Sequence, residues 1–187
     1  VEAAQQAGHP HRADLNDGEQ TGVGYSQNTR LGRRRGSTAQ TFLASVRGRA
    51  NLRVETNAQA GKLIFDGRRC VGATFRQGGV MKEIRASREV IVCGGAVNSP
   101  HLLHVSGIGP AEHLRGIGVE VLHDLPGVGA NLQDHYVARV THRVRGSISV
   151  NQLATGLRLV GEVARFAFTG RGALTFGVTT AQVFCDS

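Results

Sequence analysis

The sequence contains little that would build a disulfide-stabilised or membrane-spanning protein. Its 187 residues include three cysteines, Cys70, Cys93 and Cys185, which are odd in number and widely separated. Neither a disulfide framework nor a zinc-binding spacing follows from them. No charged-then-apolar signal segment is visible, and no apolar run approaches the roughly eighteen residues of a membrane span. We therefore expect neither export nor a membrane span, and a reducing, cytoplasmic setting.

Aromatic residues and lysine are also scarce. The net charge of +8 comes from 20 arginines and 2 lysines against 14 acidic residues, and such a balance can indicate a nucleic-acid partner. The arginines are spread along the chain, however, and seven Phe, two Tyr and no Trp offer no evident platform for stacking bases. We expect a solvated arginine-rich surface and no nucleic acid. The one cluster, Arg33 to Arg35, is interpreted as a solvated turn rather than a ligand site, because no acidic counterpart can be identified.

What is present is an α/β pattern organised around residues 89–110. The short β-branched run Val90 to Cys93 predicts a strand buried on both faces, ended by Gly94 and Gly95. Ser99-Pro100 is a helix-start signal, so a helix is predicted from His101 to Ser106. Small residues before a helix N-terminus let the backbone approach a phosphate-bearing ligand.

Before this stretch, alternating residues and turn signals predict three antiparallel strands. They cover Ala58 to Phe65, Cys70 to Arg76 and Val80 to Ala86, with turns at Asp66-Gly67 and Gly78-Gly79. The simplest interpretation is a β-meander inserted between two strands of a larger sheet.

The N-terminal part predicts helices around a long irregular segment. We expect residues 1–7 to be the end of a helix that stops at Gly8. Residues 9–36 lack periodicity and predict a long irregular segment. Ser37 and Gln40 match a capping box, which predicts a short helix that continues to Val46.

After residue 110 the pattern predicts further short elements and then one long helix. We expect a helix from Ala111 to Arg115, strands at Val119 to Leu122 and Val137 to Val144, and an amphipathic helix from Leu153 to Phe168.

Two strings carry a resemblance to a known family. Gly95-Ala96, Ser99-Pro100, Leu102-Leu103 and Ser106 to Pro110 resemble the second signature of the glucose–methanol–choline (GMC) oxidoreductases, and Asp124 to His135 resembles the family's next well-marked string. The Ile108 to Leu114 run and the Asn131 to His135 string look closest to choline-dehydrogenase-like members. The resemblance covers nearly all of the chain, which looks like an internal part of a protein about three times as long.

This resemblance implies domains, a cofactor and contact residues. Residues 1–136 would be the second part of an FAD-binding domain, with 9–36 near the substrate side, and residues 137–187 would begin a substrate-binding domain. Ala60 aligns with the position whose backbone meets the adenine ring, although by itself it is an interior strand residue. The cofactor-binding residues implied are Ala60, Gly94, Gly95, Ala96, Asn131, Gln133, Asp134 and His135.

The implied activity is FAD-dependent oxidation of the CH–OH group of an alcohol, choline-like or another primary alcohol, with the hydroxyl proton taken by a base and hydride passed to flavin N5. The family's C-terminal His with its His or Asn partner is absent, so we expect no catalytic residue in this chain. The glycine-rich loop that normally holds the FAD pyrophosphate in the family is missing as well, so we expect neither tight FAD binding nor turnover by this chain alone. A Gly-x-Gly-x-x-Gly loop is also absent, which counts against the alternative of an NAD(P)-binding α/β dehydrogenase. A non-catalytic basic binding module is the other alternative. The electron acceptor is not indicated.

Two histidine patterns have alternative interpretations. Asp134-His135 could be a base oriented by a carboxylate, but adjacent residues point in different directions, so a structural or flavin-edge role is preferred. His101 and His104 have helical spacing for half of a metal site, but without further ligands a solvated helix face is preferred and no metal is expected.

Overall fold

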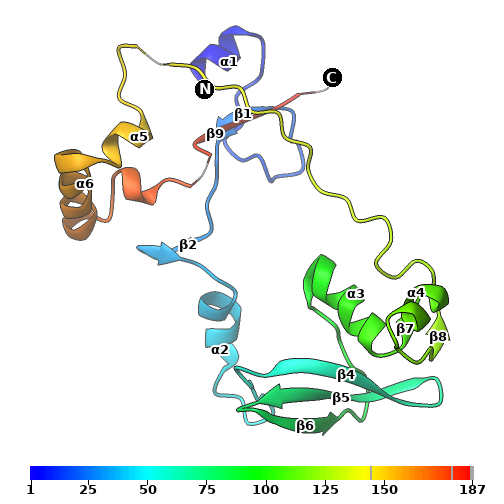
Figure 1. Ribbon diagram of the computed structural model, residues 1–187. Helices are drawn as coiled ribbons and strands as arrows, with labels where there is room; N and C mark the ends of the chain where they lie inside the picture. The colour runs from blue at the N-terminus through cyan, green and yellow to red at the C-terminus, as the bar shows by residue number, and fades with distance from the viewer. Residues whose placement is uncertain (144, 178, 186–187) are drawn as a thin grey trace. The chain divides into compact units, whose positions relative to one another are not determined.

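The computed structural model describes residues 1–143, 145–177 and 179–185, and they form two compact units (Figure 1). Unit 1 combines Val1–Leu52 with the described residues from Val140 onward, and unit 2 is Arg53–Arg139. Both units mix helices with small open sheets, which confirms the predicted α/β class with a meander. The predicted boundary at residue 136 between a cofactor and a substrate domain stays a prediction. No helix among the described residues is both long and apolar enough to cross a membrane.

Unit 2 is built on the predicted β-meander. Strands β4 (Gln59–Asp66), β5 (Arg69–Gln77) and β6 (Val80–Arg85) pair antiparallel in that order. Gln77 pairs with Val80, which leaves Gly78 and Gly79 as a two-residue turn with φ of 60° and 82°. Positive φ at both turn residues is the twist that a two-residue hairpin requires, and glycine adopts it without strain.

The rest of unit 2 packs beside the meander as short elements (Figure 1). These are α3 (Gly95–Val105), β7 (Ile108–Gly109), α4 (Ala111–Gly116) and β8 (His123–Asp124). β7 and β8 pair in parallel, and the fully buried Leu114 of α4 anchors this part. The strand expected at Val119 to Leu122 is found instead at His123–Asp124. The N–H groups of Leu122 and His123 both donate to the carbonyl oxygen of Gly107, at 2.8 and 3.0 Å, so pairing with β7 starts only at His123.

The run Val90 to Cys93 is not a strand in this structure, which corrects the prediction. It has no strand partner among the described residues, and Ile91 is 74% exposed. β-branched residues favour an extended backbone, but a strand forms only where another strand supplies hydrogen bonds.

Unit 1 joins the two ends of the chain through one pair of strands. β1 (Gly22–Tyr25) pairs antiparallel with β9 (Ala181–Phe184), and Val23 of β1 is only 1% exposed. Leu15 is also buried. The prediction that residues 9–36 are irregular is thus partly wrong. The partner of β1 lies near the other end of the chain, so local sequence could not reveal the pairing.

The remaining elements of unit 1 are short except for one helix. They are α1 (Glu2–Gln6), β2 (Arg30–Leu31), β3 (Arg34–Arg35), the π-helical turn η1 (Ala39–Leu43), α2 (Ala44–Val46), α5 (Val150–Leu153), α6 (Gly156–Thr169) and the 3₁₀ turn η2 (Ala173–Thr175). β2 and β3 form a hairpin.

Three local predictions in unit 1 need correction. The capping box at Ser37 does not form, because Gln40 N–H donates to the Ser37 carbonyl at 2.9 Å instead of to its hydroxyl. The helix expected from Leu153 to Phe168 starts later than predicted: α6 begins at Gly156, which adopts φ of 59°, and Leu153 is the last residue of the separate helix α5. Residues 137–143 contain no strand, and Val144, the end of that predicted strand, lies outside the described residues.

Candidate cofactor-binding site

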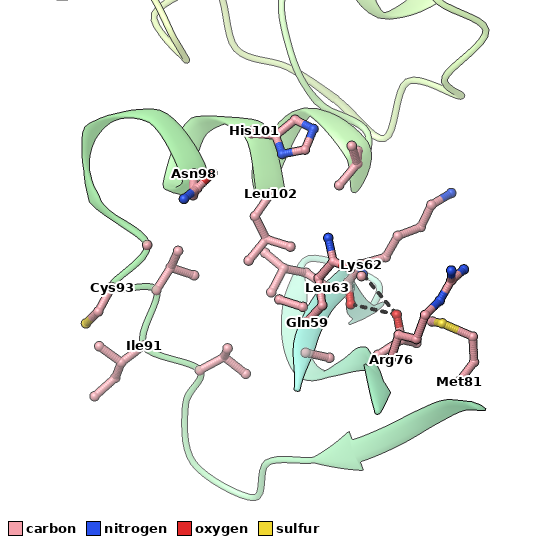
Figure 2. A pocket seen from close by; sticks show the side chains of 18 residues that line it. Gln59, Lys62, Leu63, Arg76, Met81, Ile91, Cys93, Asn98, His101 and Leu102 are labelled. Atoms are coloured by element: carbon pink, nitrogen blue, oxygen red, sulfur yellow. Dashed lines mark hydrogen bonds between the residues drawn. The ribbon is translucent and has the colours of Figure 1, made fainter. Parts of the chain in front are cut away.

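A cavity of about 890 Å³ lies in unit 2 between the meander and α3 (Figure 2). Its walls come mainly from β4 and β5, from residues Val90 to Gly94, and from one face of α3. Leu102 of α3 points toward the strands, and Leu63 of β4 faces it from below (Figure 2). The cavity is thus enclosed by apolar side chains on two sides.

A β-bulge shapes the strand that borders this cavity. The β4–β5 register shifts between Ala60 and Leu63, and the N–H of Lys62 donates to Thr74 Oγ1 at 2.9 Å. A Cβ on Gly61 would lie 2.7 Å from that same oxygen, so only glycine fits there without displacing Thr74. Bulges of this kind bend an edge strand and redirect its backbone groups.

Ser106, at the end of α3, fixes the helix onto the bulge. Its hydroxyl accepts a hydrogen bond from Leu63 N–H at 2.9 Å and donates to the carbonyl oxygen of Leu102 at 2.6 Å. Both bonds are half-buried, where an unpaired polar group would be costly. Ser106 therefore sets the distance between the helix and the strand that form opposite walls.

The N-terminal end of α3 lies at the rim of the cavity. The helix begins at Gly95, six residues before the predicted start, and Pro100 lies inside it. Pro100 is the sixth residue of α3, beyond the first turn, so the helix continues without the hydrogen bond that an N–H at this position would donate to the carbonyl of Ala96. Gly94 is the N-cap residue, and a Cβ there would approach Asn98 Cβ and Ser99 N to 3.1 Å. The free N–H groups of this end favour a negatively charged group nearby.

The structure brings some of the predicted site residues together. Ala60 and Gly94 both line the cavity, and Gly95 and Ala96 follow Gly94 directly as the first two residues of α3. The other four, Asn131, Gln133, Asp134 and His135, belong to an exposed irregular segment and are not among the lining residues. Their contact with a cofactor stays a prediction.

Among the described residues, the side chains of this exposed segment form only local hydrogen bonds. Gln133 Nε2 donates to Asn131 Oδ1 at 3.0 Å, and His135 N–H donates to Asp134 Oδ1 at 2.7 Å. The Asp134 carboxylate thus bonds the backbone of His135 rather than its imidazole, which does not match a base oriented by a carboxylate.

His104 does not lie on a solvated helix face, which corrects its interpretation. It is half-buried, and its Nε2 lies 3.0 Å from the carbonyl oxygen of Val128. A Cβ on Gly109 would lie 2.5 Å from His104 Cδ2, and one on Gly129 would lie 3.1 Å from its Cε1, so two glycines leave room for the ring. The His113 ring lies 5.4 Å away. His104 thereby ties α3 to the turn that precedes the Asn131 to His135 segment.

Charged side chains around the cavity are suited to binding rather than to proton transfer. Lys62, Arg76 and His101 contribute to the lining, whereas none of its described residues carries a carboxylate. Backbone groups of an edge strand, nearby cations and a helix N-terminus together fit a ligand that carries a planar ring and phosphate. The described residues contain no group of three His, Cys, Asp or Glu arranged to hold a metal ion.

Sequence reasoning missed Gly61, Thr74 and Ser106. A glycine inside an alternating strand was the available signal for a bulge at Gly61. No comparable signal marks Thr74 or Ser106, since their roles depend on contacts with residues 12 and 43 positions away.

Comparisons with known proteins agree with one another. The sequence model of the GMC oxidoreductase family matches residues 1–137. Among characterised relatives, an oxygen-dependent choline dehydrogenase from Pectobacterium carotovorum is 39% identical over 173 residues, covering 92% of this chain and 31% of the relative. The chain thus spans about a third of that relative's length.

Solved structures show the same similarity. Pyridoxine 4-oxidase from Mesorbium loti is 34% identical with a TM-score of 0.63, over 67% of this chain and 25% of that one. A fungal aryl-alcohol oxidase is 25% identical with a TM-score of 0.79, over 98% of this chain and 32% of that one.

Proposed function

Since the chain belongs to the GMC oxidoreductase family, we propose that the protein containing it oxidises the CH–OH group of a small alcohol with FAD as its cofactor. The observation that carries the proposal is the match of the family model to residues 1–137, which include the whole cavity of unit 2. The choline dehydrogenase relative and the aryl-alcohol oxidase neighbour support an alcohol substrate. Choline or another primary alcohol is the proposed substrate class. The cytoplasmic setting and the domain boundary at residue 136 also remain proposals.

The cavity of unit 2 fits the nucleotide end of FAD. Ala60 lies on β4, an edge strand of its sheet, directly before the bulge, so its backbone groups and small side chain can lie against a purine ring. The N-terminal end of α3, with Gly94 at its cap, can hold a phosphate. FAD supplies the chemistry by accepting the hydride from the alcohol carbon. The role we propose for these residues is to hold the nucleotide end and exclude water from it.

Gly94 and Gly95 have no side chain and Ala96 has only a methyl group, which keeps this end accessible. A Cβ on Gly95 would meet nothing within 4 Å, and Gly95 adopts φ of 79°, which an L-residue rarely does. We propose that Asn131, Gln133, Asp134 and His135 contact the flavin from their exposed segment, as the family resemblance implies. We propose no catalytic residue in this chain.

The decisive experiment uses the protein encoded by the reading frame that contains this chain. We expect it to purify with a flavin absorption band that choline or benzyl alcohol bleaches in the absence of oxygen. A colourless protein that binds no added FAD would contradict the cofactor. A flavin band that no alcohol bleaches would contradict the reaction.

The location of the nucleotide end is tested separately with Ala60→Trp in the same protein. The indole should fill the space beside β4 and lower FAD content at least about tenfold, the loss expected when close contacts are blocked. Val80→Trp, at an exposed position of β6 outside the cavity, is the matched control and should retain FAD. Equal FAD content in both variants would place the nucleotide elsewhere.

A further inference from the structure

Two arginines lie opposite each other in the β2–β3 hairpin of unit 1. Arg30 of β2 is the register partner of Arg35 of β3, and the hairpin has only one other pair, Leu31 with Arg34. Like charges directly opposite each other destabilise an antiparallel pair. The hairpin therefore concentrates positive charge at the cost of its own stability, which is unexpected for a purely structural turn.

A second cavity, of about 830 Å³, opens beside this hairpin within the same unit. The arginines that line it are Arg30, Arg33, Arg34 and Arg35. Small polar side chains and the apolar side chains of Phe166, Leu174 and Phe176 complete the wall. None of the described lining residues carries a negative charge, so the cavity combines a cationic side with an apolar one.

The guanidinium groups of the hairpin have no acidic partner in the part of the chain that the structure describes. The ion pairs among the described residues are Arg12–Glu19, Arg53–Glu55, Arg85–Glu83 and Arg165–Glu162, and none of them includes a hairpin arginine. Strand pairing places the Cα atoms of Arg30 and Arg35 opposite each other, so both side chains leave the hairpin on the same side.

Arg33 is held in place by unit 1 itself. Its Nη1 donates to the carbonyl oxygen of Ala167, near the end of α6, at 2.7 Å. Gly170 leaves room for its side chain, because a Cβ there would lie 2.9 Å from Arg33 Nε. Arg30 Nη2 donates to the carbonyl oxygen of Gly32 at 3.2 Å. Two of the four guanidinium groups are thus oriented before any ligand arrives, which favours binding of a fixed geometry.

We propose that this cavity binds a small organic anion, with its carboxylate or phosphate on the arginines of the β2–β3 hairpin and its apolar body against Phe166, Leu174 and Phe176. Guanidinium groups bind both oxyanions through paired, charge-assisted hydrogen bonds. A bound anion also removes the repulsion between Arg30 and Arg35. The site goes beyond the proposed alcohol oxidation, because neither the alcohol nor the nucleotide end of FAD assigned above requires it.

The test is calorimetric titration of the full 187-residue chain at low ionic strength with phenyl phosphate, benzoate, inorganic phosphate and benzyl alcohol. We expect the two aromatic anions to bind with 1:1 stoichiometry and inorganic phosphate to bind more weakly. Benzyl alcohol, which has the ring without the charge, should not bind. Tighter binding by phenyl phosphate or by benzoate identifies which oxyanion the site prefers. Binding of benzyl alcohol as tight as that of the anions, or binding of none of the four, would overturn the proposal.

Charge variants separate this site from the chain's general positive charge. Arg30→Gln and Arg35→Gln should each weaken aromatic-anion binding about tenfold, as expected for the loss of one charge-assisted bond. Arg158→Gln removes the same charge from α6, outside the cavity, and should bind as the parent chain does. Equal weakening in all three variants would show non-specific attraction and overturn the proposal.

Thermal unfolding tests anion binding independently of the calorimetric titration, through the melting temperature. Without ligand, either hairpin variant should melt at or above the temperature of the parent chain, because it removes the like-charge pair. With phenyl phosphate, the parent chain and Arg158→Gln should gain melting temperature, and the two hairpin variants should gain little. A ligand-free loss of stability in both hairpin variants would show that the pair is not repulsive and would contradict the proposal.

Discussion

The hydroxyl of Ser106 accepts the N–H of Leu63 at 2.9 Å and thereby joins the end of α3 to the bulge of β4. These two residues lie 43 positions apart in the sequence, and their bond spans opposite walls of the proposed cofactor site. A single hydroxyl therefore connects the meander to the helix that completes the cavity.

Replacement of Ser106 by alanine should lower the free energy of unfolding by about 1–3 kcal/mol, because it leaves the Leu63 N–H half-buried and unpaired. Ser87→Ala is the control, since Ser87 is exposed and its hydroxyl makes no hydrogen bond among the described residues. Denaturant unfolding of both variants measures the difference. Equal stability of the two would show that the Leu63 N–H finds another acceptor.

Gly109→Ala should destabilise unit 2 by about 1–3 kcal/mol, as overpacking does, because the added methyl group would lie 2.5 Å from His104 Cδ2. The partner variant His104→Ala should cost about 1 kcal/mol through loss of the bond to Val128. In the double variant the Gly109 penalty should largely disappear, since the clashing ring is gone. Strictly additive losses in this double-mutant cycle would refute the proposed packing of His104 against Gly109.

Gly72→Ala should be among the most damaging small substitutions in the meander. The new Cβ would clash with the carbonyl oxygen of Ile84, a backbone atom of the neighbouring strand, which cannot move without breaking the pairing. We expect a loss of about 3 kcal/mol or more. Gly116→Ala at the end of α4 is the matched control, because nothing lies within 4 Å of its Cβ. Similar melting temperatures for both variants would show that β6 can shift to accommodate the methyl group.

The Gln77 amide, and after it the Arg53 guanidinium, lower the pKa of Glu55 below its ordinary value. Gln77 Nε2 donates to Glu55 Oε2 at 3.0 Å, and also to the carbonyl oxygen of Thr56 at 3.0 Å. A pKa lowered by folding favours the folded state above the unfolded pKa of the carboxyl, and this contribution disappears as the pH falls through the folded pKa.

Gln77→Ala should therefore raise the pKa of Glu55 toward that ordinary value, as followed by an NMR titration of the side-chain carboxyl carbon. Gln59→Ala, a glutamine variant on the adjacent strand, should leave the pKa of Glu55 unchanged. An unchanged pKa of Glu55 in Gln77→Ala would assign the effect to Arg53 alone.

Several elements were determined by the sequence locally. The meander followed from period-two alternation and from the turns at Gly67 and Gly78-Gly79, because these signals involve neighbouring residues only. The same holds for α1 and α4, which end close to glycine. The family itself could be identified from contiguous strings between Gly95 and His135, and the match over residues 1–137 confirms it.

The tertiary structure decided whatever depends on a distant partner. Val90 to Cys93 has the composition of a buried strand, yet it remains unpaired because no described strand lies beside it. Gly22 to Tyr25 has no clear pattern, yet it becomes β1 because β9 supplies its hydrogen bonds. Likewise, the arginines of the β2–β3 hairpin are exposed, as predicted for a solvated turn, but only the tertiary structure shows that Arg30 lies opposite Arg35. A sequence pattern reflects a residue and its neighbours in the chain. Strand pairing and burial depend instead on residues that are distant in the sequence and are brought close by folding.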